Sequence, residues 1–445
     1  MRFVKALLAV AVTGLLGCSL VTGPPAGAEP ADSNGAPAPF QQWIDDTVPA
    51  PTLTAPLWQQ VLSTPTGDPI FDARPTDLDA LRPGQIIEVR DVTATTAAIM
   101  PTPLRGATLV KFRSTSAEGT PTFGTATLIV PAGEWSGPGA RPVEVNALPI
   151  NSLGLHCTPG YQFSHGILDQ PNTQLAVFMP SIWSALGKGH AVLVPDHEGP
   201  LMAYAEPNIA GHVMLDSVRA VRNQPSGEFA DSRFVAIGYS GGAIASYAAA
   251  MLLDEYAPEL AGVLTGAAAG GLVTDYRDVA HRFNGNIASG IMLSVTLAIA
   301  REHPELLPYT NHVAQWLATS GLRDICGDAD GPLGAVGLPM EAAARIDHPL
   351  DSPIAEQMYR LLDLTTRKSA VPLYIYHGLH DPWIPLEDAQ RMYAQQCGKG
   401  VPGIFRIVPG EHLIGYVTGY PGLDAWLDGR LRDEAPPNEC PPAPR

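Results

Sequence analysis

The sequence has little charge, and most of what it has is negative. Only 16% of the 445 residues are charged, and 44 acidic residues against 27 basic ones give a formal net charge of −17. Nucleic-acid binding needs a basic face, and so does electrostatic adhesion to anionic lipid. The composition therefore argues against a nucleic-acid partner and against electrostatic adhesion to anionic lipid.

Cysteine is also scarce, and none of the five cysteines forms a C-x-x-C pair of the kind found in zinc and redox sites. Cys18 lies in the N-terminal leader, which leaves Cys157, Cys326, Cys397 and Cys440 in the rest of the chain. In an exported protein an even number of cysteines implies disulfides. We expect two bridges, and four cysteines allow three pairings.

A run long enough to cross a membrane is missing from the N-terminal leader. Arg2 and Lys5 precede the apolar run Ala6–Gly17, which is well short of the roughly 20 residues of a membrane span. An Ala-x-Ala site ending at Ala28 follows, as in a secretory signal peptide. We expect a secreted protein cleaved near Ala28, with lipoprotein anchoring at Cys18 as the alternative.

The strongest local signal is the run Gly238-Tyr239-Ser240-Gly241-Gly242. Apolar residues 234–237 precede it and an alanine-rich stretch, 243–253, follows. This pattern predicts a buried strand, a tight turn and a helix, and the glycines are needed because side chains would collide in the turn. The Ser240 hydroxyl would then lie at the helix N-terminus, where negative charge is stabilised. We predict that Ser240 is a nucleophile.

A serine nucleophile needs a base, and the base needs a carboxylate that orients it. In folds with this nucleophile turn, the chain order is Ser, then Asp or Glu, then His. Asp381 follows a predicted strand at 372–376, and His412 follows the next one at 403–408. We therefore predict Asp381 as the acid and His412 as the base.

The oxyanion of such a reaction is held by two N–H groups. One belongs to the residue after the nucleophile, here Gly241, and the other comes from a loop after an early strand. That loop is 147–154, and it lacks the His-Gly-Gly-Gly run of some esterases. Asn151 is the candidate for the second donor, and Ser152 comes next.

The run Asp196-His197-Glu198-Gly199 suggests a metal site at first sight. The His-Glu-x-x-His spacing of zinc hydrolases is absent, however. We interpret the run as a hydrogen-bonded carboxylate network that braces the active site. We expect neither a metal nor an organic cofactor.

Strands alternate with helices along most of the chain, which predicts an α/β fold with a mostly parallel sheet covered on both faces. Between a strand predicted at 260–264 and the one at 372–376 the pattern is helical only. We expect this insertion to form a cap or lid, with extra helices covering the core as the alternative. Residues 291–299 are expected to be the core of the cap rather than an acyl tunnel.

The predicted parts are a signal peptide (1–28), an irregular N-terminal arm (29–80), the first part of the core (81–272), the cap (273–360), and the second part of the core with the tail (361–445).

The chain resembles the secretory lipases typified by the fungal Candida-type lipase A, from about Asp68 to Cys440. This resemblance implies an α/β-hydrolase with a helical cap that cleaves carboxylic esters and triglycerides without a cofactor. It carries the triad onto Ser240, Asp381 and His412, and the first oxyanion donor onto Gly241. The stretches that carry the resemblance are 168–172, 196–199, 238–243, 377–381 and 410–412.

The same resemblance bears on two further features. The family has an aspartate as second oxyanion donor, where this chain has Asn151. The resemblance therefore carries over the backbone N–H of that residue but no side-chain role. The family also implies the disulfide pairs Cys157–Cys326 and Cys397–Cys440.

Together these features predict a secreted serine ester hydrolase of lipase type that forms an acyl-enzyme on Ser240. An acyltransferase with the same triad, a serine peptidase and a non-catalytic surface or binding protein are the alternatives. The expected partner is a lipid or ester substrate, with transient contact between the cap and a lipid interface. The sequence does not indicate an oligomeric state.

Overall fold

The computed structural model describes residues 39–166, 173–329 and 334–441. The predicted signal peptide, the alternative anchor at Cys18 and the stretch 168–172 lie outside these ranges. Within them, no helix combines the length and the apolar character needed to cross a membrane.

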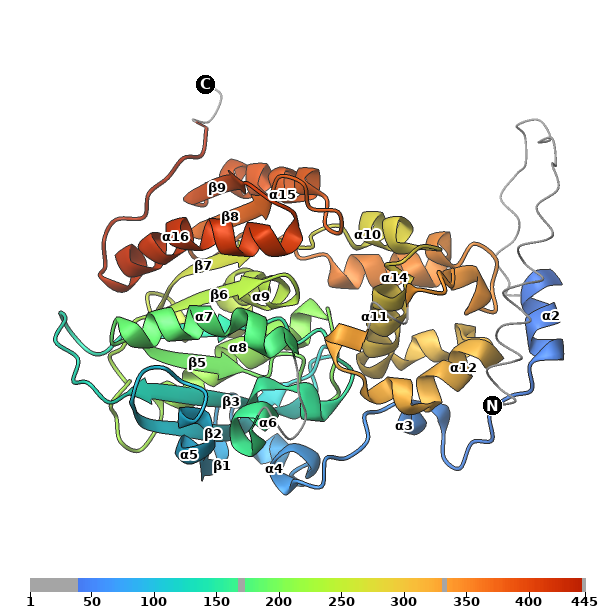
Figure 1. The fold of residues 1–445 in the computed structure, drawn as a ribbon, viewed down its shortest axis with the longest axis horizontal. Helices are drawn as coiled ribbons and strands as arrows, with labels where there is room; N and C mark the ends of the chain where they lie inside the picture. The colour runs from blue at the N-terminus through green and yellow to red at the C-terminus, as the bar shows by residue number, and fades with distance from the viewer. Residues whose placement is uncertain (1–38, 167–172, 330–333, 442–445) are drawn as a thin grey trace.

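A nine-stranded sheet forms the centre of the molecule (Figure 1), in the order β1-β2-β3-β5-β4-β6-β7-β8-β9. In this order, neighbouring strands from β5 to β9 pair in parallel. At the other edge, β1, β2 and β3 pair antiparallel, and β3 also pairs antiparallel with β5. Parallel strands are buried on both faces, which explains why β6 is apolar throughout. The strands are β1 (Ile86–Asp91), β2 (Leu104–Thr115), β3 (Pro121–Pro131), β4 (Val143–Ala147), β5 (Ala191–Pro195), β6 (Phe234–Tyr239), β7 (Leu264–Gly270), β8 (Leu373–Gly378) and β9 (Gly403–Val408).

Helices cover both faces of this sheet. On one face pack α8 (Pro207–Arg222), α9 (Gly241–Tyr256) and α15 (Leu386–Gly398). On the other face pack α7 (Thr173–Gly187) and α16 (His412–Leu431). Alternate residues of each strand point to opposite faces, so the sheet contributes side chains to two separate cores.

The interval between β7 and β8 contains helices and no strand in its described residues. Its α-helices stand beside the sheet as a separate group in Figure 1. We call residues 273–360 the cap segment; its boundaries stay a prediction, and its last helix runs slightly beyond residue 360. The α-helices of the group that lie wholly within the described residues are α10 (Tyr276–Phe283), α11 (Ser289–Glu302), α12 (His312–Thr319) and α14 (Pro353–Leu362).

The strand predicted at 260–264 is misplaced: residues Pro258–Leu260 form a 3-10 turn, and β7 begins at Leu264. The actual strand was missed because its sequence is mostly glycine and alanine, which rarely favour strands. Close packing requires these small residues. A Cβ on Gly266 would lie 2.7 Å from the Trp426 ring, and one on Gly270 would lie 2.2 Å from Tyr376.

The sequence pattern of residues 423–432 indicates a helix, but the start of that helix lies earlier than the pattern suggests, since α16 begins at His412. Gly415, Gly419 and Pro421 made the preceding segment look broken. The glycines permit close packing on β8 instead: a Cβ on Gly419 would lie 2.3 Å from Tyr376, and one on Gly415 would lie 3.0 Å from Gly378. Tertiary contact here outweighs local helix propensity.

The N-terminal arm, predicted to be irregular, contains the short helices α2 (Pro39–Thr47), α3 (Leu57–Gln60) and α4 (Pro69–Asp72). Three of its prolines, Pro39, Pro56 and Pro69, stand at or just before helix starts, where a missing N–H costs nothing. Asp68 also caps α4, because its side chain accepts a hydrogen bond from the N–H of Ile70.

Candidate active site

The Ser240 turn joins β6 to α9 at the carboxyl edge of the sheet. Ser240 has a φ of 53°, a left-handed conformation that side chains rarely adopt. A Cβ on Gly238 would lie 2.0 Å from the carbonyl oxygen of Gly242, and a Cβ on Gly242 would lie 1.9 Å from that of Ala147. Both glycines are therefore required, as predicted from the sequence, and the turn presents the Ser240 hydroxyl in front of α9.

The predicted triad residues lie in hydrogen-bond contact. Nε2 of His412 lies 2.9 Å from Oγ of Ser240, and its Nδ1 lies 2.5 Å from Oδ2 of Asp381. This is the geometry in which a histidine takes a proton from serine while a carboxylate orients the ring.

Backbone groups prepare Asp381 for this position. Its Oδ1 accepts hydrogen bonds from the N–H groups of Trp383 (2.9 Å) and Ile384 (3.0 Å). Burial opposes ionisation, but the hydrogen bond and charge of His412, together with these N–H groups, hold the pKa of Asp381 below its ordinary value. The carboxyl group is therefore charged at neutral pH.

His412 is the first residue of α16. Glu411 caps this helix by accepting from the N–H groups of Leu413 (3.0 Å) and Ile414 (2.9 Å). The hydroxyl of Tyr239 donates to the carbonyl oxygen of His412. These contacts hold His412, the predicted base, against β6, the strand that leads to Ser240. The sequence did not reveal that α16 starts at this residue.

Asn151 lies beside Gly241 at the start of α9. It has a φ of 48°, and its buried Oδ1 has no hydrogen-bond partner among the described residues. A Cβ on Gly241 would lie 1.9 Å from this oxygen, so only glycine fits there. The first N–H groups of a helix have no partner inside the helix, and the Gly241 N–H therefore suits an oxyanion. The role of Asn151 as second donor stays a prediction.

Ser152, the other candidate of this loop, has a structural role. Its hydroxyl donates to the carbonyl oxygen of Ile150 (2.6 Å) and accepts from the N–H of Gly327 (3.0 Å). Gly327 belongs to the cap segment, and no sequence pattern near Ser152 signals this contact.

Arg301, which the sequence did not single out, ties the same loop to the cap. It is 1% exposed, and its guanidinium donates to the carbonyl oxygens of Leu153 (2.7 Å), Arg323 (2.7 Å) and Val61 (3.0 Å). Burial lowers its pKa to about 10, so it remains charged. The only signal in the sequence was a basic residue at the end of an apolar helical run.

The disulfides strengthen the same connections. Cys157, just beyond the oxyanion loop, is bonded to Cys326 of the cap segment. Cys397 of α15 is bonded to Cys440 of the tail. These are the pairs that the resemblance implied, and the first holds cap and oxyanion loop together.

The run 196–199 follows β5 and contacts the oxyanion loop through His197. Asp196 accepts from the Thr125 hydroxyl (2.5 Å) and the Gly160 N–H (2.8 Å), while Nε2 of His197 lies 2.9 Å from the carbonyl oxygen of Leu148. Burial raises the pKa of Asp196 to about 7 and lowers that of His197 to about 4. The two side chains bond to separate partners rather than converging on one point, which fits the bracing interpretation.

A cavity of about 740 Å³ opens above the triad, between the sheet and the cap. Ser240, Gly241, Asn151 and His412 lie on its wall, and none of its described lining residues is Asp, Glu, Lys or Arg. Residues 291–299 were expected to form the core of the cap. Met292, Ala298 and Ile299 are indeed buried in apolar clusters of this region. Every residue of the stretch except Ala298 also lines the cavity, so α11 contributes both to the packing of the cap and to the cavity wall.

The family model described as secretory lipase matches residues 168–439, which is more than half of the chain. The chain belongs to the secretory lipase family. Similarity extends to Lipase 10 of Candida albicans, 27% identical over 401 residues that cover 85% of this chain and 83% of that protein. The secreted triacylglycerol lipase LIP5 of Malassezia globosa is 29% identical over 352 residues, covering 76% and 72%.

Among solved structures, this secretory lipase is similar to Candida antarctica lipase A in its closed state. The TM-score is 0.75 at 25% identity, and the match covers 85% of this chain and 89% of the other. The predicted family and α/β-hydrolase fold are confirmed, and so is lipase as the enzyme class.

Proposed function

We propose that this chain hydrolyses triacylglycerols and related carboxylic esters through an acyl-enzyme on Ser240. The observation that carries the proposal is the hydrogen-bonded series Ser240, His412 and Asp381, of which Ser240 and His412 lie on the wall of a cavity whose described lining has no Asp, Glu, Lys or Arg. An apolar cavity of this size suits an acyl chain and offers no ion pair to a charged substrate. The relatives named as lipases support the same substrate class.

In the first half of the reaction, Oγ of Ser240 attacks the ester carbonyl carbon while Nε2 of His412 takes the hydroxyl proton. The carbonyl oxygen becomes negative and accepts hydrogen bonds from the N–H groups of Gly241 and Asn151. Charged Asp381 stabilises the imidazolium that forms on His412.

The intermediate then collapses. The bond to the alcohol oxygen breaks, and His412 gives its proton to that oxygen, so that an alcohol leaves and the acyl group stays on Ser240. A water molecule, deprotonated by His412, attacks the acyl carbonyl. The fatty acid departs, the proton returns to Ser240, and the site is restored. Apart from the substrate and this water, the steps use only Ser240, His412, Asp381 and the two N–H donors.

Two finer features belong to this proposal. Cleavage near Ala28 would release the mature chain into the exterior, in keeping with a secretory family. Residues 273–360 would act as one cap over the cavity, held to the oxyanion loop by Arg301 and by Cys157–Cys326.

Fatty-acid release from a triolein emulsion tests the proposal. We expect the native chain to release fatty acid and Ser240→Ala to lose at least about 10,000-fold in rate, with an unchanged circular dichroism spectrum. Activity near that of the native chain in Ser240→Ala would refute the assignment. With a competing alcohol present, new ester as the main product would indicate the acyltransferase instead.

A further inference from the structure

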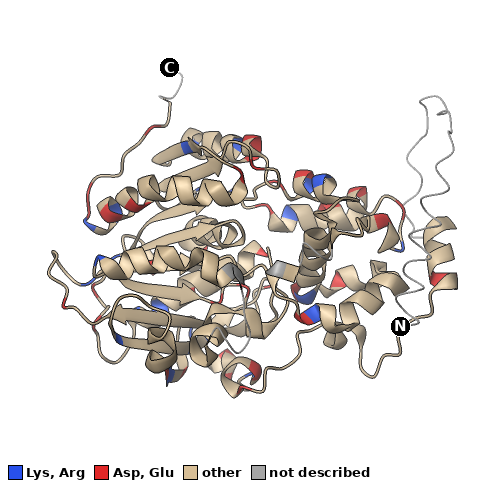
Figure 2. Cartoon of the chain, viewed as in Figure 1, with Lys and Arg blue, Asp and Glu red and all other residues tan. Residues whose placement is uncertain are grey.

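The solvent-facing side of α16 is unusual for a helix on the surface of a globular protein. Such helices normally expose polar and charged residues. Here the first turns expose Leu413, Ile414 and Val417, with 52%, 51% and 62% of each side chain accessible. Between His412 and Asp424 the helix contains no Asp, Glu, Lys, Arg or His. Figure 2 shows its charged residues gathered toward the C-terminal end.

The neighbouring helix α7 has the same character. No Asp, Glu, Lys or Arg occurs between Thr173 and Gly187, and the helix exposes Val177 (48%), Pro180 and Trp183 (37%). The two helices lie side by side, because the Tyr420 hydroxyl of α16 donates to the carbonyl oxygen of Ser181 in α7 (3.3 Å).

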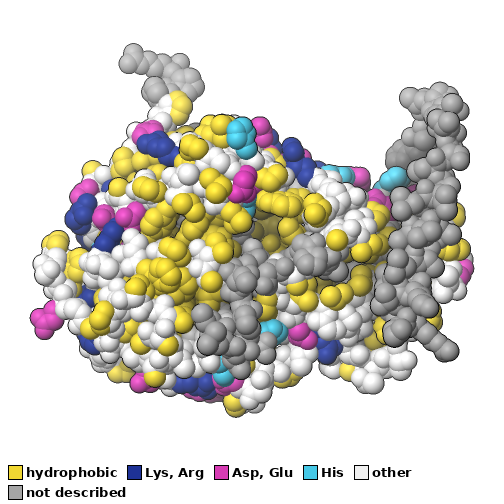
Figure 3. Space-filling view, viewed as in Figure 1, with side chains coloured by type: hydrophobic (Ala, Val, Ile, Leu, Met, Phe, Trp, Pro, Cys, Tyr) yellow, Lys and Arg dark blue, Asp and Glu magenta, His cyan; other side chains and the backbone are white. Residues whose placement is uncertain are grey.

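Together these exposed side chains form one apolar surface, which we call the platform: Val177, Pro180, Trp183, Leu413, Ile414 and Val417. Figure 3 shows hydrophobic side chains gathered over this part of the molecule. Soluble proteins rarely expose contiguous apolar surface unless something binds there. A tryptophan at its edge is typical of a surface that meets a lipid headgroup region.

The platform is continuous with the entrance to the active site. Val177 and Leu413 are exposed on it and also line the cavity that contains Ser240. Leu413 directly follows the proposed base. A lipid that touched the platform would therefore face an unbroken apolar path to the nucleophile.

We propose that the platform is the docking surface for an uncharged or zwitterionic lipid surface. This inference rests on the proposed function, since it names the physical form in which the ester reaches the site. The absence of basic residues from the platform, on a chain with a net charge of −17, favours lipids without net negative charge. Docking would thus involve α7 and α16 of the core, whereas the sequence pointed to the cap.

Three matched variants test the proposal, each made in the Ser240→Ala chain so that binding is measured without turnover. Val417→Gln alters the platform, Val336→Gln alters an equally exposed position of the cap segment (65%), and Val89→Gln alters an exposed position of β1 (54%). Binding to phosphatidylcholine vesicles is measured by co-sedimentation. We expect Val417→Gln to lower the partition coefficient about 10-fold, the other two to stay within about 2-fold, and added salt to have little effect.

The same substitutions in the active chain give a second measurement. Val417→Gln should slow triolein-emulsion hydrolysis at limiting lipid while leaving hydrolysis of a soluble nitrophenyl ester unchanged. A native chain that binds vesicles without hydrolysing either ester would contradict the proposed function alone.

Three outcomes would overturn the proposal that the platform binds a lipid surface. They are equal binding by all three variants, a loss confined to Val336→Gln, or a loss of self-association in Val417→Gln with vesicle binding intact. The second outcome would assign docking to the cap, and the third would make the platform a contact between copies of the chain.

Discussion

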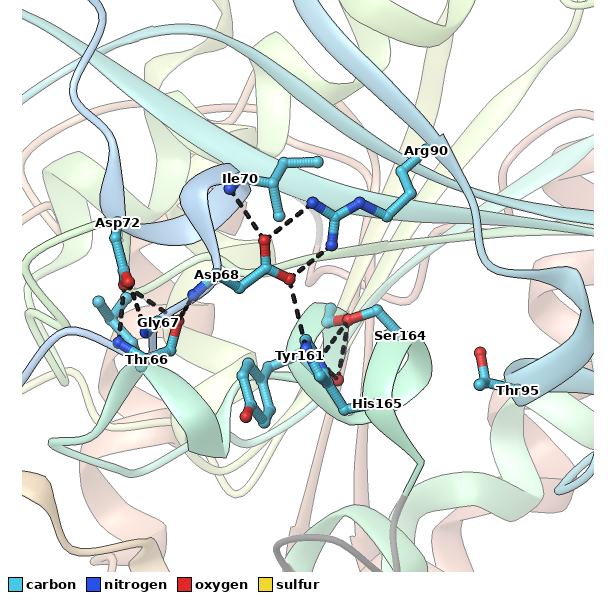
Figure 4. Close-up of polar contacts among 12 residues, drawn as sticks. Thr66, Gly67, Asp68, Ile70, Asp72, Arg90, Thr95, Tyr161, Ser164 and His165 are labelled. Carbon is cyan, nitrogen blue, oxygen red and sulfur yellow. Dashed lines mark hydrogen bonds and ion pairs between the residues drawn. The ribbon is translucent and has the colours of Figure 1, made fainter.

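Two serine–histidine–aspartate groupings in this molecule can be compared, and we propose that one of them is catalytic. Besides the group at Ser240, Oγ of Ser164 lies 3.0 Å from Nδ1 of His165, and Nε2 of that histidine lies 3.3 Å from Oδ2 of Asp68 (Figure 4). The ring nitrogens are exchanged between the two groupings: Ser240 contacts Nε2 of His412, whereas Ser164 contacts Nδ1 of His165. The groupings differ further in what surrounds each serine and each carboxylate.

The serines differ in the helix end at which they lie. Ser164 is in the last turn of α6 (Pro159–His165), where the helix dipole opposes negative charge. Its hydroxyl lies within hydrogen-bond distance of the carbonyl oxygens of Gly160 (2.9 Å) and Tyr161 (3.0 Å). Ser240 stands at the start of α9, beside the N–H of Gly241. An oxyanion would be stabilised only in the second case.

The carboxylates differ as well. Asp68 is engaged by the guanidinium of Arg90 through two contacts, at 2.5 and 2.8 Å, as Figure 4 shows. This pairing lowers the pKa of Asp68 and neutralises its charge, so little remains to stabilise an imidazolium. Asp381 has backbone N–H groups and His412 as its partners. The comparison teaches that a triad is recognised by its oxyanion donors and by a carboxylate that is not paired with an arginine.

The largest effect should separate the two aspartates. We expect Asp381→Asn to lower kcat on a soluble nitrophenyl ester about 1,000- to 10,000-fold, since the amide would favour the wrong tautomer of His412. Asp68→Asn and Ser164→Ala should stay within about 2-fold. Similar losses at Asp68 and Asp381 would remove the distinction.

A smaller effect should define the oxyanion donor at Asn151. Asn151→Gly keeps the backbone N–H and tolerates the φ of 48°. We expect kcat to fall by no more than about 5-fold, against a loss of about 100-fold or more when a true oxyanion donor is removed. Asn151→Ala should be worse than Asn151→Gly, because alanine is strained at this φ. An equal, large loss in both variants would assign the donor to the side chain.

The smallest expected effect is on the free energy of unfolding, to which Asp68 contributes through its ion pair with Arg90. We expect Asp68→Asn to lower the free energy of unfolding by about 1 kcal/mol at pH 7. Because the folded pKa of Asp68 is lowered, this contribution is fully present above about pH 4 and is lost as pH falls through the folded value. Urea unfolding of both chains at pH 7 and pH 3 measures it. A difference that grows toward acid would contradict the ion-pair account.

Residue patterns predicted the proposed triad because each member depends on local rules. Ser240 needs glycines at fixed positions, and Asp381 and His412 follow strand ends. The start of α16 at His412 was not predictable, since Gly415 and Gly419 are explained by contacts with β8, far away in the sequence. The roles of Arg301 and Ser152 likewise depend on cap residues that only the folded chain brings near.

The central claim is that Ser240, among the serines of this chain, carries the acyl group. Reaction with a fluorophosphonate ester, followed by proteolysis and mass spectrometry, tests it most directly. The account predicts one adduct, on the peptide that contains Ser240, with loss of activity in proportion to labelling and no adduct at Ser164. Full inactivation with Ser240 unmodified, or an adduct at Ser164, would contradict it.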